Sequence, residues 1–164
     1  MPAGQLITIL LAEDDADDRF LIQTAFMESR IQGQLRFVND GNQLMDYLLQ
    51  RGDYADESGF PRPHVVILDL NMPRKDGREA LLKIKQDPAL RNLPLVVLTT
   101  SSLKQDKDYC SELEVSDYIV KPNSYTGLLG VMNRVMRVYQ NSLSIQSKID
   151  HVRPVEDEGS TIPA

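Results

Sequence analysis

Five short runs of apolar and β-branched residues recur along the chain, and a stretch compatible with a helix follows each of them. The runs lie at residues 6–11, 35–38, 65–68, 95–98 and 118–120. Strands that are apolar along their whole length are buried on both faces, as in parallel sheets that carry helices on either side. The alternation therefore predicts five β-α units, and hence an α/β fold with a doubly wound parallel sheet of five strands and five helices.

Beyond Tyr139 the apolar pattern gives way to Ser, Gln, Asp, Glu and Pro. At 164 residues the chain is long enough for one α/β core and little more. We therefore predict one domain over residues 1–140 and a polar, flexible tail over residues 141–164. The loop at residues 52–63, rich in Gly, Asp and Pro, is predicted to be a plain connector before the third strand.

Polar residues follow four of the apolar runs, at the points where the predicted strands end. They are Glu13 and Asp14 after the first run, Asp69 after the third, Thr99 after the fourth and Lys121 after the fifth. Because the carboxyl ends of parallel strands lie at one edge of a sheet, we expect these side chains to face a common crevice. Asp69 closes the strand at residues 65–68 and precedes a loop with Pro and Gly, so it is the candidate centre of the site.

The charge of this crevice indicates a bound cation. Two carboxylates about 4 Å apart repel each other by roughly 4 kcal/mol at an effective dielectric constant near 20. Lys121 is insufficient to balance three carboxylates, whereas Mg2+ with oxygen ligands would relieve the repulsion and leave positions for a phosphoryl oxygen. Asp69 is then a candidate nucleophile that forms an aspartyl phosphate, with Thr99 and Lys121 bonding the phosphoryl oxygens.

Other charged residues have simpler interpretations. Asp15, Asp17 and Asp18 are acids of the kind favoured at a helix N-terminus. The two histidines, His64 and His151, lack partner ligands at zinc-binding spacing.

The overall charge and the single cysteine restrict the environment and the partners. A net charge of -6 disfavours nonspecific binding to nucleic acid or to an anionic membrane, so protein partners are expected. The first apolar segment, residues 6–12, is too short for a signal peptide or a membrane span. Cys110 has no partner for an internal disulfide, and a reduced, bacterial-type cytoplasm is the expected location.

The motifs ILLAEDD, LDLNMPRKDG, VVLTTS and DYIVKP occur in this order along the chain. With them the chain resembles the receiver domains of bacterial two-component response regulators, from about residue 6 to residue 139. The resemblance implies a flavodoxin-like receiver fold with strand order 2-1-3-4-5. It also implies that Asp69 accepts a phosphoryl group from a sensor histidine kinase, while Glu13, Asp14, Asp69 and the main-chain carbonyl of Asn71 hold Mg2+.

The same resemblance implies how phosphorylation becomes a signal. Thr99 resembles the switch hydroxyl of the family, Tyr118 its switch aromatic residue and Lys121 its phosphate-binding lysine. The peptide bond between Lys121 and Pro122 is expected to be cis. We expect Thr99 to move toward the phosphoryl group and Tyr118 to turn into the space it leaves, which changes the surface of the fourth helix, fifth strand and fifth helix.

The stand-alone organisation points to particular partners. The loop GDYADESGFPRP and the run DGREALLKIKQDP are similar to single-domain regulators that serve bacterial phytochromes, and other sensor kinases use similar regulators. The expected partners are a sensor histidine kinase, with a bacterial phytochrome as the specific candidate, and a histidine phosphotransfer protein. A second copy of the chain is another, because the last helix has a broad apolar band. The band comprises Leu128, Leu129, Val131, Met132, Val135, Met136, Val138 and Tyr139.

Two alternatives stay open at this point. In a haloacid-dehalogenase-like phosphatase, the segment LDLN would hold an aspartate nucleophile, but a second acid is needed two residues later, where this chain has Asn71. That family also places its nucleophile after an early strand, whereas Asp69 follows the third. The other alternative is a receiver-like module that binds partners without phosphate, although its hallmark would be a damaged crevice.

Overall fold

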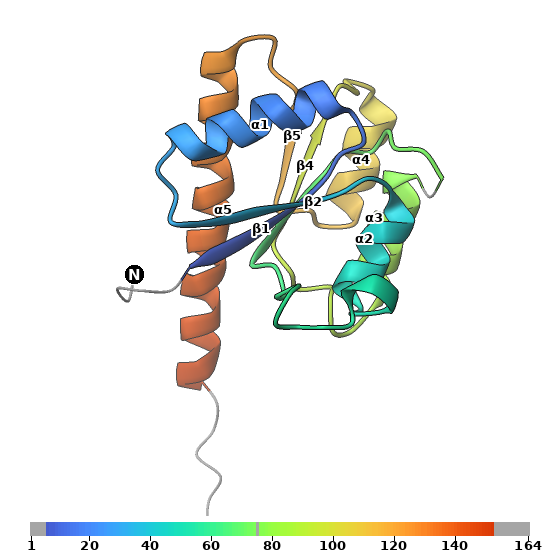
Figure 1. The fold of residues 1–164 in the computed structure, drawn as a ribbon. Coiled ribbons are helices and arrows are strands. Elements are labelled where there is room, and N and C mark those ends of the chain that lie inside the picture. The colour runs from blue at the N-terminus through green and yellow to red at the C-terminus, as the bar shows by residue number, and fades with distance from the viewer. Residues whose placement is uncertain (1–5, 75, 153–164) are drawn as a thin grey trace, which may run out of the picture.

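The protein folds around a parallel sheet of five strands in the order β2-β1-β3-β4-β5, as Figure 1 shows. The structure is a computed structural model and describes residues 6–74 and 76–152. The elements are β1 (Ile7–Ala12), α1 (Ala16–Glu28), β2 (Gly33–Val38), α2 (Gly41–Leu48), the 3-10 helix η1 (Gly52–Tyr54), β3 (Val65–Leu68), α3 (Gly77–Gln86), β4 (Leu95–Thr99), α4 (Lys104–Glu112), β5 (Asp117–Val120) and α5 (Tyr125–Val152). The predicted fold class, strand order and five helices are confirmed.

Alternate residues of each central strand point into two separate cores. In β3, Val65 and Ile67 pack with α1 and α5, whereas Val66 and Leu68 pack with α2, α3 and α4. These four side chains are fully buried, which is why this strand is apolar at every position. The helices therefore cover both faces of the sheet (Figure 1).

The register brings the carboxyl ends of the strands to one edge. Ala12 at the end of β1 pairs with Leu68 at the end of β3, and Leu68 pairs with Val97 of β4. On the other side of β4, Thr99 pairs with Val120, the last residue of β5. The residues that follow these strands consequently start from neighbouring points.

The starts of α1 and α3, on this side of the sheet, are held by aspartate caps. Asp15 accepts a hydrogen bond from the backbone N–H of Asp18 at 2.9 Å and begins α1. Asp76 begins α3 in the same way, with a bond of 2.7 Å from the N–H of Arg78. Gly77 follows this cap, and a Cβ atom there would lie 2.3 Å from the carbonyl oxygen of Asp69. Only glycine allows α3 to approach the backbone of the Asp69 loop so closely.

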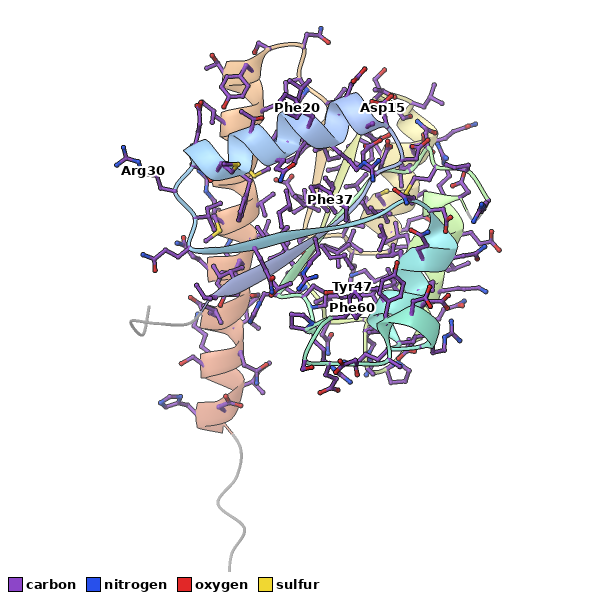
Figure 2. The ribbon with its side chains drawn as sticks, viewed as in Figure 1. Asp15, Phe20, Arg30, Phe37, Tyr47 and Phe60 are labelled. Atoms are coloured by element: carbon purple, nitrogen blue, oxygen red, sulfur yellow. The ribbon has the colours of Figure 1, made fainter. Side chains whose placement is uncertain are left out.

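The segment between α2 and β3 is more ordered than the plain connector that its composition predicted. Tyr47, Tyr54 and Phe60 form an aromatic cluster, with ring centroids between 5.0 and 6.0 Å apart. Figure 2 shows Tyr47 and Phe60 side by side. The phenol of Tyr47 also donates a hydrogen bond to the carbonyl oxygen of Pro61 at 2.9 Å, so these side chains hold the loop against α2.

Two sequence-based expectations need correction. Residues 141–152, expected to belong to the flexible tail, continue α5, since the chain has no Gly or Pro between Gly130 and Pro154 to end the helix. The remaining tail, residues 153–164, lies outside the described residues. No peptide bond of the described residues is cis, so the Lys121–Pro122 bond is trans, the form that X–Pro bonds favour by about 0.5–1 kcal/mol.

Across residues 6–74 and 76–152, none of the helices combines the length and apolar character that crossing a lipid bilayer requires.

Candidate functional site

Three carboxylates meet at the carboxyl edge of the sheet. Glu13 and Asp14 follow β1, Asp69 follows β3, and one oxygen from each lies within 4.8 Å of the others. Glu13 and Asp69 are 1% and 4% exposed, whereas Asp14 is exposed. The predicted convergence of these residues is therefore present, and an ion bound between them would be reachable from solvent beside Asp14.

Lys121 joins this group from the end of β5. Its Nζ atom lies 2.7 Å from Glu13 Oε2, 2.7 Å from Asp18 Oδ2 and 3.0 Å from Asp69 Oδ2. Asp18 was predicted to be no more than a helix N-terminal acid. It lies in the first turn of α1, which passes above the sheet edge, and its contact with Lys121 spans 103 positions of sequence. The excess of acids in EDDADD was the only signal that pointed toward it.

We call Glu13, Asp14, Asp18, Asp69 and Lys121 the acidic cluster. Burial raises the pKa of the Glu13 carboxyl to about 7; the hydrogen bond from Lys121 opposes this rise, and the charge of Asp69 adds to it. Burial alone would lower the pKa of Lys121, but hydrogen bonds to Asp18 and Glu13 outweigh it and the pKa is raised. The ammonium is thus charged at neutral pH, while the carboxylates still exceed it in number.

Asp69 is connected to the next strand through Asn71. Its Oδ1 atom accepts a hydrogen bond from the backbone N–H of Asn71 at 3.1 Å, and the Asn71 side-chain amide lies 3.5 Å from Thr99 Oγ1. Thr99 is completely buried, and its Oγ1 also accepts a bond from the N–H of Ser101 at 3.3 Å. The phenol of Tyr118 donates to the carbonyl oxygen of Ser101 at 2.8 Å. The two predicted switch residues therefore meet at Ser101.

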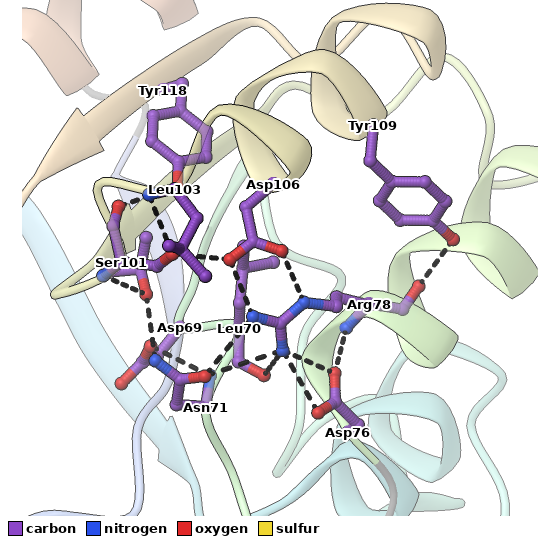
Figure 3. A network of polar contacts seen from close by, with 11 residues as sticks. Asp69, Leu70, Asn71, Asp76, Arg78, Ser101, Leu103, Asp106, Tyr109 and Tyr118 are labelled. Atoms are coloured by element: carbon purple, nitrogen blue, oxygen red, sulfur yellow. Dashed lines mark hydrogen bonds and ion pairs between the residues drawn. The ribbon is translucent and has the colours of Figure 1, made fainter.

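A second polar network, which was not predicted, lies beside this site (Figure 3). Arg78 forms a bidentate ion pair with Asp106, with Nε–Oδ1 and Nη2–Oδ2 distances of 2.6 and 2.7 Å, and also contacts Asp76. The Asp106 carboxylate accepts a further hydrogen bond from the Ser101 hydroxyl. Asp106 is buried, although it belongs to the strongly polar run KQDKD, which by itself is typical of a solvated helix face.

Comparison with known proteins agrees with this fold. Residues 9–133 match the response regulator receiver domain, and the chain belongs to this family. It is 37% identical over 137 residues to the response regulator Rcp1 of Synechocystis sp. (strain ATCC 27184 / PCC 6803 / Kazusa), covering 84% of this chain and 91% of Rcp1.

Two solved structures add detail to the comparison. The phosphorylated cyanobacterial phytochrome response regulator RcpA is 40% identical, with a TM-score of 0.71 over 77% of this chain and 89% of RcpA. The Mn(2+)-bound form of Rcp1 is likewise 40% identical, with a TM-score of 0.71 over 76% of this chain and 91% of that structure's chain. The relatives thus include single-domain, phytochrome-associated regulators, which agrees with the predicted subgroup.

Proposed function

We propose that this protein is a single-domain response regulator that accepts a phosphoryl group on Asp69 from a sensor histidine kinase. The observation that carries the proposal is the placement of the Asp69 carboxylate within bonding distance of Lys121 and next to Glu13 and Asp14, at the open edge of the sheet. An Oδ atom of Asp69 attacks the phosphorus atom of a phosphohistidine. The new O–P bond forms as the P–N bond to the histidine breaks, and the imidazole leaves.

Mg2+ fits the donor set of this site. The ligands on offer are carboxylate oxygens, which a hard cation prefers, and the four carboxylates of the acidic cluster outnumber the single ammonium of Lys121. Glu13, Asp14, Asp69 and the main-chain carbonyl of Asn71 would hold the ion. When bound, the ion would neutralise the negative charge that otherwise repels a phosphoryl donor. The Mn(2+)-bound Rcp1 structure supports the choice of a divalent cation.

The residues around Asp69 have separate tasks in this proposal. Lys121 Nζ, 3.0 Å from Asp69 Oδ2, lies close enough to bond an oxygen of a phosphoryl group at that atom. Thr99 and Tyr118 then respond to the added charge of about -1.5 to -2. Their rearrangement alters the surface of α4, β5 and α5, where a downstream protein binds. A coupling of about 1–3 kcal/mol would change its affinity by one to two orders of magnitude.

A phytochrome-type histidine kinase is the partner that the comparisons favour. RcpA is named as a phytochrome response regulator, and a structure with a TM-score of 0.73 and 35% identity belongs to a regulator in red light signaling of R. palustris. We extend that partner class to this chain, with a histidine phosphotransfer protein as a second route for the phosphoryl group and the cytoplasm as its location. Incubation with purified kinases of known sensor type would test the choice.

The homodimer stays a prediction. Much of the apolar band of α5 packs in the core: Leu128, Val131, Met132, Val135 and Tyr139 are buried, and Leu129, Met136 and Val138 are partly buried against the same cluster. Leu143, Ile145 and Ile149 farther along the helix are exposed. Sedimentation at high concentration, with and without phosphorylation, would test dimer formation, and a monomer in both states would reject it.

The central experiment is incubation with acetyl phosphate and Mg2+, followed by intact mass measurement. The wild type should gain one phosphoryl group, Asp69→Asn should gain none, and Asp53→Asn, which changes an exposed aspartate away from the cluster, should behave as the wild type. A phosphoryl adduct that persists in Asp69→Asn would reject the assignment of the acceptor.

The same preparation separates the two alternatives. Steady turnover of a phosphomonoester would favour a phosphatase of the haloacid-dehalogenase-like class, although the family assignment speaks against it. A wild type that binds its partners equally well with and without labelling would favour a phosphate-independent binding module.

A further inference from the structure

The ion pair between Arg78 and Asp106 joins two helices that lie on the same face of the sheet. Arg78 is in the first turn of α3 and Asp106 in the first turn of α4. We propose that this pair, the Arg78–Asp106 clamp, positions the loop between β4 and α4 and opposes its rearrangement when Asp69 is phosphorylated. The clamp is a regulatory device within the proposed function and rests on it.

On the α4 side, the clamp holds Ser101. The Asp106 oxygen that accepts from Arg78 Nη2 also accepts the hydrogen bond from the Ser101 hydroxyl. Ser101 in turn donates its N–H to Thr99 Oγ1 and accepts from Tyr118 through its carbonyl oxygen. Figure 3 shows Ser101 beside Asp106 and Tyr118. One residue is thus bonded to the clamp and to both residues proposed to carry the signal.

On the α3 side, the clamp reaches the loop that begins at Asp69. Arg78 Nη1 lies 3.1 Å from Asp76 Oδ2, and 3.4 Å from both the Leu70 carbonyl oxygen and Asn71 Oδ1. The close approach of Gly77 to the Asp69 carbonyl keeps α3 against that loop. The clamp therefore connects the backbone after the acceptor residue to the backbone after Thr99.

The clamp differs from an ordinary surface ion pair. The Arg78 and Asp106 side chains are 32% and 8% exposed, whereas Lys104 and Asp108, paired on the outer side of the same α4, are 89% and 56% exposed. Bidentate, charge-assisted bonds fix orientation as well as distance. The Arg78 guanidinium holds the pKa of the Asp106 carboxyl below its usual value, so both partners stay charged near neutral pH.

The hydrogen bonds of Ser101 connect the clamp to the movement expected of Thr99. If Thr99 moves toward a phosphoryl group on Asp69, Ser101 must follow it or lose the bond from its N–H to Thr99 Oγ1. Either movement disturbs the bonds from Ser101 to Asp106 and Tyr118, and Arg78 holds Asp106 from the far side. Weakening the clamp should therefore increase the population of the rearranged loop before phosphorylation and speed the reaction with a small donor.

Two variants test the clamp, and a third is a matched control. Asp106→Asn weakens the ion pair with little change in side-chain size. Ser101→Ala keeps the ion pair and removes the two hydrogen bonds of the Ser101 hydroxyl, one to Asp106 and one from the Leu103 N–H, so it remains informative if Asp106→Asn folds poorly. Asp108→Asn makes the same chemical change as Asp106→Asn two residues away, at an exposed position of α4.

The first measurement is backbone amide hydrogen exchange over residues 100–106 without a phosphoryl donor, leaving out Leu103, whose N–H donates to the Ser101 hydroxyl itself. Exchange should be faster in Ser101→Ala and Asp106→Asn than in the wild type, and unchanged in Asp108→Asn. Unchanged exchange in both clamp variants would show that the clamp does not restrain the loop, and the proposal would be overturned.

The second measurement is the rate at which acetyl phosphate and Mg2+ add phosphoryl mass. Both clamp variants should react about fivefold faster or more, the lower end of typical allosteric couplings, and Asp108→Asn should react at the wild-type rate. A pair that merely stabilises the fold would lower the melting temperature without this acceleration, so an equal or slower rate overturns the proposal. A wild type that gains no phosphoryl mass overturns the proposed function as well, whereas a labelled wild type with unaccelerated variants rejects the clamp alone.

Discussion

The acidic cluster and the Arg78–Asp106 clamp are both groups of charged side chains around one basic residue, but their balance differs. Lys121 is bonded to three carboxylates, and the Asp14 carboxylate lies within 4.8 Å of two of these. Arg78 pairs with two carboxylates, Asp76 and Asp106, and its fork satisfies both Asp106 oxygens. The first group has an excess of negative charge that favours a further cation, whereas the second is largely satisfied by its own members.

The two groups lie at the same edge of the sheet but are suited to different tasks. An unbalanced group is suited to binding an ion and a phosphoryl group, because its own residues leave charge uncompensated. A balanced and directional group is suited to holding two elements in register. The stability of the protein should therefore respond differently when the two groups are changed: to substitution at the clamp, and to added Mg2+ and to pH at the acidic cluster.

The largest effect is expected from removal of one clamp partner. Arg78→Met leaves the buried Asp106 carboxylate without its cation and should lower the free energy of unfolding by roughly 2–4 kcal/mol, since breaking a buried pair strands a charge. The double variant Arg78→Met/Asp106→Leu removes both charges and should recover part of this loss. Urea unfolding of the wild type, both single variants and the double variant measures this loss and its recovery. A double variant as unstable as the sum of its singles would show that the pair is not coupled.

Addition of Mg2+, bound at the acidic cluster, should raise the free energy of unfolding of the protein by a somewhat smaller amount. At a concentration one hundred times the dissociation constant, binding to the folded state alone adds about 2.7 kcal/mol. Asp14→Asn removes an exposed ligand oxygen and should abolish most of the gain, while Asp17→Asn, an exposed acid nearby on α1, should keep it. Thermal unfolding with and without Mg2+ shows the outcome, and an equal gain in Asp14→Asn would contradict the proposed ligand set.

A pH dependence should come from Glu13, measured with a chelator so that no metal competes. Burial raises the pKa of this carboxyl to about 7 in the folded protein, from 4.5. At a pH between these two pKa values, the Glu13 carboxyl has lost its proton in the unfolded chain but still holds it in the folded protein. The free energy of unfolding should therefore fall as the pH rises. The expected fall is about 1–3 kcal/mol. Glu13→Gln should flatten this slope, and an unchanged slope would assign the dependence to another group.

The smallest effect is expected at the exposed pair on α4. Lys104 and Asp108 are 2.9 Å apart at an i,i+4 spacing in which both side chains are largely solvated. Asp108→Asn should change the free energy of unfolding by only about 0.2–0.5 kcal/mol, and less at high salt. A loss as large as that in Arg78→Met would remove the distinction between a satisfied buried pair and a surface pair.

The fold could be predicted well from the sequence because a strand that is buried on both faces is apolar at every position. Val65–Leu68 has no polar position, and a strand of that kind has few alternatives once a helix follows it. The positions of Glu13, Asp14, Asp69 and Lys121 followed from the same rule. The continuation of α5 to Val152 was missed, because the Ser, Gln and Asp residues beyond Tyr139 were interpreted as a polar tail, although Leu143, Ile145 and Ile149 lie among them.

The clamp and Asp18 could not be read from the chain in advance. Arg78 and Asp106 lie 28 positions apart on two different helices, and each alone is typical of a solvated surface. Local sequence determined which residues form strands and which carboxylates end them, since hydrophobic burial and the pleat act over a few neighbours. Only tertiary packing decided which charges face one another, because the rotation and spacing of helices on the sheet depend on all the side chains packed between them.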